Sequence, residues 1–244
     1  KQRLNLALEK AQKMSADGAD IIDLGGQSSR PGAKAISVKE ELLRTVTAVK
    51  LLVKKITTPI SIDTTKPEVA RACLEAGAQI INDISGLRDK RMIRVAARYK
   101  AAVVIMHMPG LPVNMQKKIA YHSLIDDITA YLKTAIDSAC SGGIKPDKII
   151  IDPGLGFGKT KEDNLEIMRH LPDFKVLGKP ILIGPSRKSF IGKVLGADVK
   201  EGCAGSLALS VIAACNGANI LRVHDVKETN QSLKIVTAIK NADA

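Results

Sequence analysis

The sequence predicts an α/β protein of parallel strands, most specifically a (β/α)8 TIM barrel. Three observations favour this class. Short apolar runs recur along the whole chain, each followed by a polar or glycine-rich corner and a longer amphipathic stretch. The apolar runs lack clean alternation, which is typical of parallel strands covered on both faces. The length of 244 residues suits a complete barrel, so one domain is expected over residues 1–244.

The expected strands and helices alternate along the chain. We place strands at residues 19–24, 59–63, 79–83, 102–107, 148–152, 180–184 and 219–224. We place helices at residues 37–55, 67–76, 123–141, 161–170 and 203–216, and the chain also opens with a helix. A closed barrel needs eight strands and only seven are found. We therefore expect the first strand and its loop to precede Lys1; the alternative is an open, doubly wound sheet.

Three segments carry the chemistry of a helix start. They are Ser37-Val-Lys-Glu40, Thr65-Lys-Pro-Glu68 and Asp225-Val-Lys-Glu228. In each, the first side chain can accept a hydrogen bond from an N–H of the new helix while the glutamate reaches back. Pro67 supplies a preset φ in the first turn, where its missing N–H is harmless.

The composition favours an aliphatic core and a small anionic ligand. Hydrophobic residues make up 45% of the chain but aromatic residues only 2%, so Ile, Val, Leu and Ala must fill the core. The formal net charge of +12 could serve nucleic acid, an acidic surface or small anions. No Lys/Arg-rich run or aromatic stacking platform is found, so we expect no nucleic-acid partner.

The cysteine pattern and the hydropathy predict a cytoplasmic protein. The four cysteines are far apart and form no C-x-x-C pair, which argues against a zinc site and a disulfide framework. No apolar stretch approaches the length of a membrane span, and the first residues carry no signal-peptide pattern. We therefore expect no membrane partner.

Nearly every expected strand ends in polar residues. In a barrel such residues gather at one rim, where the active sites of this fold lie. They are Gln27, Ser28, Ser29, Arg30, Asp63, Asn82, Asp83, His107, Asp152, Ser186, Arg187, Lys188, Arg222 and His224. Two have a simpler interpretation, Asp83 as a turn residue and His107 as a hydrogen-bonded structural histidine. His122 and His170 lie on helical patterns and are expected at the surface.

Arg222 and His224 are the basic residues that we favour most for function. They are two apart on an expected strand and so project to the same side, while Asp225 points away and suits a helix cap. Together with Arg187 and Lys188 they would place several donors where such barrels often bind phosphate. This grouping predicts an anionic substrate.

The segment Gly154-Leu-Gly-Phe-Gly-Lys-Thr160 resembles two phosphate-binding motifs without matching either. A Walker A loop needs glycine where Pro153 stands, and a dinucleotide fingerprint needs glycine where Lys159 stands. What remains is a glycine-rich corner through which a ligand can approach the backbone closely. Lys159 and Thr160 are interpreted as the start of a helix and left out of the site.

Seven segments, in order, resemble the dihydropteroate synthases. The resemblance runs from about Gly18 to about Val226. The matching stretches are Asp23-Leu-Gly-Gly-Gln-Ser-Ser-Arg-Pro-Gly32, Ser61-Ile-Asp-Thr64, Ile81-Asn-Asp-Ile-Ser-Gly86, Met106-His-Met-Pro-Gly110 with Asn114-Met-Gln116, Asp152 to Thr160, Ser186-Arg-Lys-Ser-Phe-Ile-Gly192 and Arg222-Val-His-Asp225.

The resemblance implies a reaction, a cofactor and an assembly. The family condenses 6-hydroxymethyl-7,8-dihydropterin diphosphate with 4-aminobenzoate to give 7,8-dihydropteroate and diphosphate in folate biosynthesis. Magnesium diphosphate leaves the pterin methylene, and the aryl amine attacks the resulting cation. We therefore expect Mg²⁺ as cofactor, small-molecule substrates and a homodimer.

The resemblance also implies the roles of individual residues. Asp63, Asp152 and Lys188 would be catalytic. The pterin pocket would comprise Asp63, Asn82, Met106, Asp152, Lys188 and Arg222. Ser28, Ser29, Arg222 and His224 would bind the diphosphate or another anion. Arg30 and Phe157 would lie on the aminobenzoate side.

Two departures from the family pattern affect the anion side. The family usually has Glu-Ser-Thr where this chain has Gln27-Ser28-Ser29, so one charge and one methyl group are lost while the Ser29 hydroxyl remains. The family's first strand, with an asparagine and a mobile loop that touch magnesium diphosphate, is expected to precede Lys1. We therefore expect no metal ligand within this chain.

Two other functions remain as alternatives. One is a pterin-binding barrel that passes a methyl group from methyltetrahydrofolate to a corrinoid protein, which has no reason to keep the 186–192 and 106–108 segments. The other is a pterin-binding domain without turnover, as part of a longer fused polypeptide. A shared fold alone says little about function. Diphosphate release from pterin diphosphate and 4-aminobenzoate therefore separates both alternatives from the synthase.

Overall fold

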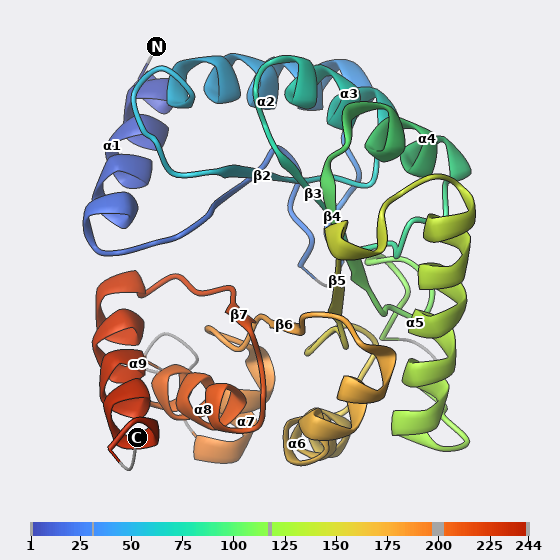
Figure 1. Cartoon of the computed structure of the whole chain (residues 1–244), viewed down its shortest axis with the longest axis vertical. Helices are drawn as coiled ribbons and strands as arrows, with labels where there is room; N and C mark the ends of the chain where they lie inside the picture. Colours follow the sequence, from blue (N-terminus) through green and yellow to red (C-terminus); the bar gives the residue numbers. More distant parts are fainter. Residues whose placement is uncertain (1, 31, 117–118, 197–202, 243–244) are drawn as a thin grey trace.

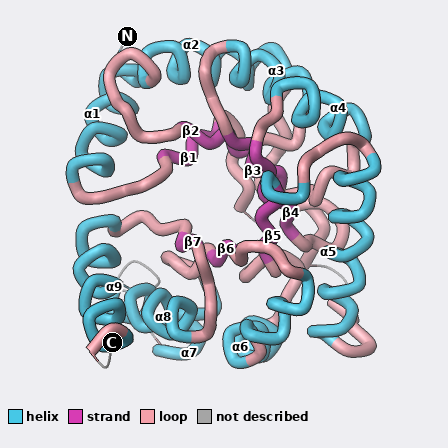
Figure 2. The backbone as a smooth tube through the Cα atoms, viewed as in Figure 1, coloured by secondary structure: helices cyan, strands magenta, loops and turns pink. Residues whose placement is uncertain are grey.

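The computed structural model describes residues 2–30, 32–116, 119–196 and 203–242. Pro31, which belongs to the first family-like segment, lies outside the described residues. The helices form an outer ring and the strands lie inside it (Figures 1 and 2). An open, doubly wound sheet would instead carry helices on both of its faces. The arrangement is that of an α/β barrel.

All strands described are parallel and follow the chain order. Strands β1 (Ile22–Gly25), β2 (Ile60–Asp63), β3 (Ile80–Asp83), β4 (Ala102–Met106) and β5 (Ile149–Asp152) form one sheet. Strands β6 (Leu182–Ile183) and β7 (Ile220–Leu221) form a second, and an isolated bridge between Ile151 and Ile181 joins β5 to the β6 side. Within the described ranges, no strand pairing connects β7 to β1.

The last two strands are shorter than expected. The sequence predicted residues 180–184 and 219–224, whereas only two residues of each pair as strand. Pro185 follows β6 and has no backbone N–H to donate to a ladder. Arg222 and His224 therefore lie beyond β7 rather than on it.

Helices connect the strands around the outside of the barrel. They are α1 (Gln2–Ala16), α2 (Val38–Leu52), α3 (Pro67–Glu75), α4 (Lys90–Tyr99), α5 (Leu124–Ser141), α6 (Lys161–Arg169), α7 (Ser189–Leu195), α8 (Cys203–Cys215) and α9 (Val226–Lys240), with short 3-10 turns at Pro146–Lys148 and Leu171–Leu177. Helices α4 and α7 were not expected. Helix α7 has only seven residues, too few for a clear apolar period, and α4 buries just Met92, Ile93 and Ala96.

The three predicted helix starts have different outcomes. Ser37 caps α2, and its hydroxyl accepts from the Glu40 N–H at 3.2 Å, as expected. Thr65 does not cap α3, because the helix begins one residue later and Lys66 takes the cap position ahead of Pro67. Asp225 holds the cap position of α9, but its side chain makes no cap bond.

The core is aliphatic and covers both faces of the strands. All four residues of β2 are buried, and Ile62, Ile81, Val103, Ile149 and Ile151 have no exposed surface. Continuous burial explains why the strand sequences lack alternation. Within the described part of the chain, no helix is long and apolar enough to cross a membrane.

The first and last helices are neighbours on the outside of the barrel. Helices α1 and α9 lie next to each other in the ring (Figure 1). The Asn230 side-chain amide of α9 donates to the Asp17 carbonyl at 3.1 Å, just after α1. Gly18 follows with φ +99°, and a Cβ there would meet the Asn230 amide nitrogen at 2.0 Å. Glycine is therefore required at this closure.

Candidate active site

The sheet register brings the predicted pterin residues side by side. Asp63, the last residue of β2, pairs with Asn82 of β3, and Met106, the last residue of β4, pairs with Asp152 of β5. All four are buried or nearly so. Because parallel strands present their carboxyl ends at one edge, both pairs lie at the same rim of the barrel.

An arginine and two aspartates form the charged centre of this rim. Arg222, just after β7, donates through Nε to Asp23 Oδ2 at 2.6 Å and through Nη2 to Asp63 Oδ2 at 3.3 Å. The Asn82 amide donates to the same Asp23 oxygen at 3.2 Å. Residues nearly two hundred positions apart therefore hold one another in place, although Arg222 keeps 43% of its side chain exposed.

Asp63 has an unusually basic carboxylate. Its pKa is raised to about 7, mainly by burial and also by the nearby Asp23, while Arg222 opposes both effects. Desolvation disfavours the charged form, and like charges disfavour it again. Asp63 therefore changes its charge near neutral pH, as titratable groups at functional sites often do.

Asp152 and Lys188 form a second charged pair across the rim. Burial raises the pKa of Asp152 above its usual range, although the Gly154 N–H at 2.7 Å and Lys188 oppose this. Burial lowers the pKa of Lys188 to about 8, against the attraction of Asp152. Lys188 holds the cap position of α7 with extended backbone angles, which leaves its side chain to the rim rather than to the helix.

Phe157 and Met106 provide the apolar wall of the site. Met106 packs with Ile84, Met108 and Met115, and Phe157 lies against this cluster. The Lys188 ammonium stands 4.5 Å from the centre of the Phe157 ring, a cation–π contact. Phe157 therefore touches both the apolar wall and a predicted catalytic residue.

His224 lies at the rim but does not share the contacts of Arg222. Its Nδ1 lies 3.0 Å from the Ser186 hydroxyl, which also accepts from the His224 N–H at 3.3 Å. Burial lowers its pKa, and Arg187 and Arg222 lower it further. The neutral form therefore dominates at pH 7.

Arg187 does not join the predicted cluster of anion donors. Its guanidinium donates to Asp225 at 2.6 Å and remains largely exposed. This ion pair also explains why Asp225 does not cap α9. Arg187 has φ +56°, which a non-glycine residue adopts only where the surroundings demand it, and its N–H donates to the Ser206 hydroxyl at 3.0 Å.

The predicted anion residues after β1 lie outside the buried rim. Ser28 and Arg30 are exposed and Ser29 is half-buried. The Ser28 hydroxyl accepts only a long bond of 3.4 Å from the Arg30 N–H among the bonds described for it. Arg30 is near enough to help lower the pKa of His224. The structure therefore places these residues at the entrance, without bringing them onto Arg222.

Gln27 is tied to a buried ion pair beneath the entrance. Its side-chain oxygen accepts from Lys66 Nζ at 2.8 Å and from the Ile36 N–H at 3.0 Å. Lys66 also pairs with Glu41, which is 1% exposed and accepts from the Thr64 hydroxyl at 2.6 Å. Gln27 thus anchors the loop after β1 to this buried ion pair.

Two residues of the site were missed from the sequence. Asp23 lay inside a quoted motif but received no role, although it is the main partner of Arg222, and its Oδ1 is buried with no hydrogen-bond partner. Lys159 was interpreted as a helix start, whereas it is buried and its Nζ lies 3.0 Å from His107 Nδ1. Only Thr160 starts α6, through a capping box with Asp163.

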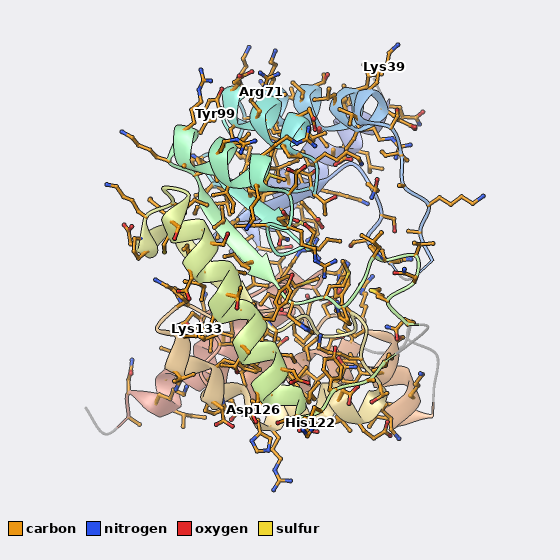
Figure 3. All side chains as sticks on the ribbon, turned by 90° about the vertical axis from the view of Figure 1, so that its right-hand side faces the viewer. Lys39, Arg71, Tyr99, His122, Asp126 and Lys133 are labelled. Atoms are coloured by element: carbon orange, nitrogen blue, oxygen red, sulfur yellow. The ribbon has the colours of Figure 1, made fainter. Side chains whose placement is uncertain are left out.

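The simpler interpretations of the other polar residues are confirmed. Asp83 makes a turn, accepting from both the N–H and the hydroxyl of Ser85. His107 is buried and hydrogen-bonded. His122 and His170 are exposed, and Figure 3 shows His122 projecting outward at the start of α5.

Among the described residues, no group of three or more His, Cys, Asp or Glu could hold a metal ion, so these residues form no ready-made metal site. Mg²⁺ is usually held by one or two carboxylates together with substrate phosphates and waters. The unpartnered Asp23 oxygen is the rim atom that fits this chemistry best.

Comparisons with known proteins agree with this geometry. The family model described as pterin binding enzyme matches residues 1–224. The chain is 46% identical to a dihydropteroate synthase of Synechocystis sp., covering 97% of this chain and 82% of that protein. It superposes on a Yersinia pestis dihydropteroate synthase solved with a sulfonamide drug with a TM-score of 0.95 at 41% identity, covering 97% of this chain and 86% of that one.

A third comparison concerns the substrate side. A Xanthomonas albilineans dihydropteroate synthase solved with 4-aminobenzoic acid superposes with a TM-score of 0.93 at 39% identity, covering 98% of this chain and 85% of that one. The predicted barrel class is confirmed by these structures. The similarity over nearly the full length, together with the rim of paired strand-end residues, shows that the chain belongs to the dihydropteroate synthase family of pterin-binding enzymes.

Proposed function

We propose that this chain condenses 6-hydroxymethyl-7,8-dihydropterin diphosphate with 4-aminobenzoate, giving 7,8-dihydropteroate and diphosphate for folate biosynthesis. The observation that carries this proposal is the group of buried polar residues at the carboxyl ends of the strands: Asp63 pairs with Asn82 on β2 and β3, and Asp152 lies at the end of β5, where it attracts the charge of Lys188. A pterin presents amino and ring N–H donors along one edge and a carbonyl acceptor beside them. This group offers the matching acceptors and one donor.

Asp152 and Lys188 would bind the pterin ring between them. The buried Asp152 carboxylate accepts from the pterin donors in a pair of parallel hydrogen bonds, while the Lys188 ammonium donates to the ring carbonyl. Asn82 can both donate and accept along the same edge. Met106 would pack on the ring face at the floor, and Arg222 would cover it from above.

The aspartates would also stabilise charge during the reaction. The C–O bond between methylene and diphosphate breaks, the diphosphate keeps the electron pair, and a cation forms on the pterin. The amine of 4-aminobenzoate then forms the C–N bond and loses a proton to solvent. Asp63 and Asp152 lie where positive charge develops, and fixed charges in a buried site need no reorganisation. No covalent nucleophile is required.

The leaving group would be held by the cationic side of the rim. Arg222, His224, Ser28 and Ser29 are the residues that we assign to diphosphate or another anion. Arg30 and Phe157 are assigned to the aminobenzoate side. Magnesium, when bound with the diphosphate, would supply neutralisation of the charge that builds up on the leaving oxygens.

The decisive experiment follows both products of the reaction. The protein is incubated with pterin diphosphate, 4-aminobenzoate and Mg²⁺, and diphosphate and dihydropteroate are measured in parallel. Equal amounts of both are expected. Pterin binding without either product would support a binding domain instead. Methyl transfer from methyltetrahydrofolate to a corrinoid protein would support the other barrel activity.

A homodimer is supported by the unusual polarity of α8. Its buried side chains include Ser206 and Ser210, whereas Ala208 and Ile212 face outward. Apolar residues on the outer face of a helix whose inner face is polar can mark an interaction surface. Helix α9 packs along it, with Lys240 donating to the Ala214 carbonyl at 3.0 Å. We therefore infer that α8 lies between two copies of this chain.

This assembly is tested by sedimentation velocity. Ile212→Glu is expected to convert the dimer into a monomer, because the substitution would bury a charge in an apolar interface. Leu43→Glu on α2, which is exposed on another part of the barrel, is the matched control and should leave the dimer intact. A dimer of unchanged stability with Ile212→Glu would contradict the proposal.

A further inference from the structure

Lys159 lies under the glycine-rich loop that follows β5, which comprises residues 154–158. Its side chain is buried, and its Nζ lies 3.0 Å from the Phe157 carbonyl and 3.0 Å from His107 Nδ1. An ammonium group has three donors and no acceptor, so it donates to both atoms. A buried lysine that points away from solvent and holds a loop carbonyl is an uncommon arrangement.

The neutral His107 ring can accept a hydrogen bond from Lys159. Burial, together with the charges of Lys159 and Arg88, lowers the pKa of His107 to about 3, so the ring is neutral. With Nδ1 accepting, the ring proton is assigned to Nε2. The ring packs edge-on against Tyr131, with 4.9 Å between the centroids, which fixes its orientation.

The loop itself is pressed between the segment after β4 and Lys188. Gly154 has φ +77°, and a Cβ there would meet the His107 carbonyl at 2.0 Å. A Cβ on Gly156 would meet Lys188 Cδ at 3.2 Å. The Tyr121 hydroxyl donates to the Gly158 carbonyl at 2.8 Å. Movement of the loop would therefore change the surroundings of Lys188.

Phe157 is the residue through which this loop reaches the substrates. Its ring touches the Lys188 ammonium and the Met106 cluster, and its carbonyl is the one that Lys159 holds. The ring projects from the same backbone unit as the carbonyl, so a fixed carbonyl restricts where the ring can be placed. The orientation of the Phe157 ring thus depends on the contact between Lys159 and the carbonyl.

We propose that Lys159, seated on His107, is a positioning residue that fixes Phe157 and loop 154–158 for the binding of 4-aminobenzoate. This inference rests on the proposed function. Lys159 contacts no substrate in this scheme and acts through Phe157. Its removal should therefore affect the aminobenzoate side more than the pterin side, where Asp152 and Asn82 are held by their strands.

The charges around Lys159 make this positioning depend on pH. The pKa of Lys159 is lowered to about 7: burial is the main cause, Asp152 and Asp163 oppose it, and Lys188 adds to it. His107 is neutral. As the pH rises through about 7, the ammonium loses its proton, and its bonds to Phe157 and His107 lose their charge-assisted strength. The KM for 4-aminobenzoate should therefore rise on the alkaline side.

The test compares Lys159→Met with Lys161→Met at saturating levels of the other substrate. Methionine keeps the length of the side chain and removes its donors. Lys159→Met is expected to raise the KM for 4-aminobenzoate about tenfold, to change the KM for pterin diphosphate less than about twofold, and to abolish the alkaline rise. Lys161, two residues along, carries the same charge and pairs with Glu162 near the surface, so its variant should match the wild type.

Each other outcome has a definite meaning. An unchanged KM for 4-aminobenzoate, or equal rises for both substrates, would overturn the inference. If the wild type makes no dihydropteroate, the proposed function fails instead. If Lys159→Met does not fold, two other measurements decide. The KM of the wild type for 4-aminobenzoate should rise with pH, and His107→Phe, which keeps a ring without the acceptor, should raise the same KM. A KM that does not change with pH, together with an unaltered KM in His107→Phe, would refute the positioning role.

Discussion

The buried half of the rim and its entrance are held in place by different means. Asp63, Asn82 and Asp152 lie at the carboxyl ends of strands, where the backbone ladder pairs Asp63 with Asn82 and Asp152 with Met106. Ser28 and Arg30 follow β1 on a loop and are exposed. The carboxylates and the amide of the proposed pterin pocket are therefore held by the sheet, whereas the contacts described for the proposed anion residues after β1 are local to their loop.

Arg222 links the two halves. It lies just beyond β7, pairs with Asp23 and Asp63 on the buried side, and still exposes 43% of its side chain. A guanidinium placed in this way can neutralise the carboxylates before the substrate arrives and turn to the anion afterwards. The two halves are thus coupled by one cation.

The largest effect is expected from Asp152→Asn in the buried half. The change places an amide donor against the pterin donors and leaves at least one of them unpaired in a buried site. We expect pterin affinity to fall about hundredfold, measured by calorimetry. Asp147→Asn in the exposed turn before β5 is the matched control. An unaltered affinity with Asp152→Asn would remove that residue from the pocket.

Arg222→Met should have the next largest effect, because it breaks the link between the halves. Without the cation, the pKa of Asp63 rises further, since Arg222 opposes the effect of burial. The leaving group also loses a donor. We expect kcat/KM for pterin diphosphate to fall about thirtyfold, the loss of one charge-assisted contact, in steady-state kinetics. Arg169→Met at the exposed end of α6 should have no effect; an equal loss there would indicate a general charge effect.

The pH dependence of pterin binding separates the halves without a substitution. Asp63 has a raised pKa of about 7, so it is neutral below that pH and ionised above it. Lys188 has a lowered pKa of about 8, so its ammonium is lost above that pH. Affinity for a pterin without phosphate should therefore peak between about pH 7 and 8 and fall up to tenfold per unit on the acid side. The acid limb should be absent in Asp63→Asn; a limb that persists would place the titrating group elsewhere.

The smallest effect is expected from Ser28→Ala at the entrance. The Ser28 hydroxyl makes only a long local bond, so its loss should change pterin affinity less than about twofold. The KM for pterin diphosphate should rise about threefold, because the diphosphate loses one donor. Kinetics and calorimetry on the same preparation test both statements. A loss of pterin affinity as large as that of Asp152→Asn would contradict the division into halves.

The sequence predicted the buried half well because strand ends are local features. An apolar run that stops at Asp63 or Asp152 places that residue at the rim whatever the loops do. The expectations that Asp83 makes a turn and that His122 and His170 lie at the surface are also confirmed. The strand–helix alternation also identified the barrel, although it missed α7, which is too short to show a period.

The contacts that were missed depend on residues far apart in the sequence. Asp23 meets Arg222 only because the barrel brings β1 and the end of β7 to one rim. Lys159 follows Gly158 in a way that suits a helix start, and its burial is explained only by its partner His107, which lies just after β4. Arg187 was grouped with the anion donors because its partner Asp225 was assigned to a cap. Such pairings are set by tertiary packing, which local patterns do not encode.

A crystal structure with 6-hydroxymethylpterin bound tests the central claim most directly. The account predicts the pterin amino and ring N–H groups within hydrogen-bond distance of Asp152, the ring carbonyl on Lys188, and the ring packed over Met106. The loop after β1 should remain as exposed as in the free protein. A pterin bound by Ser28 and Arg30 at the entrance, with Asp152 left in its present contacts, would contradict the account.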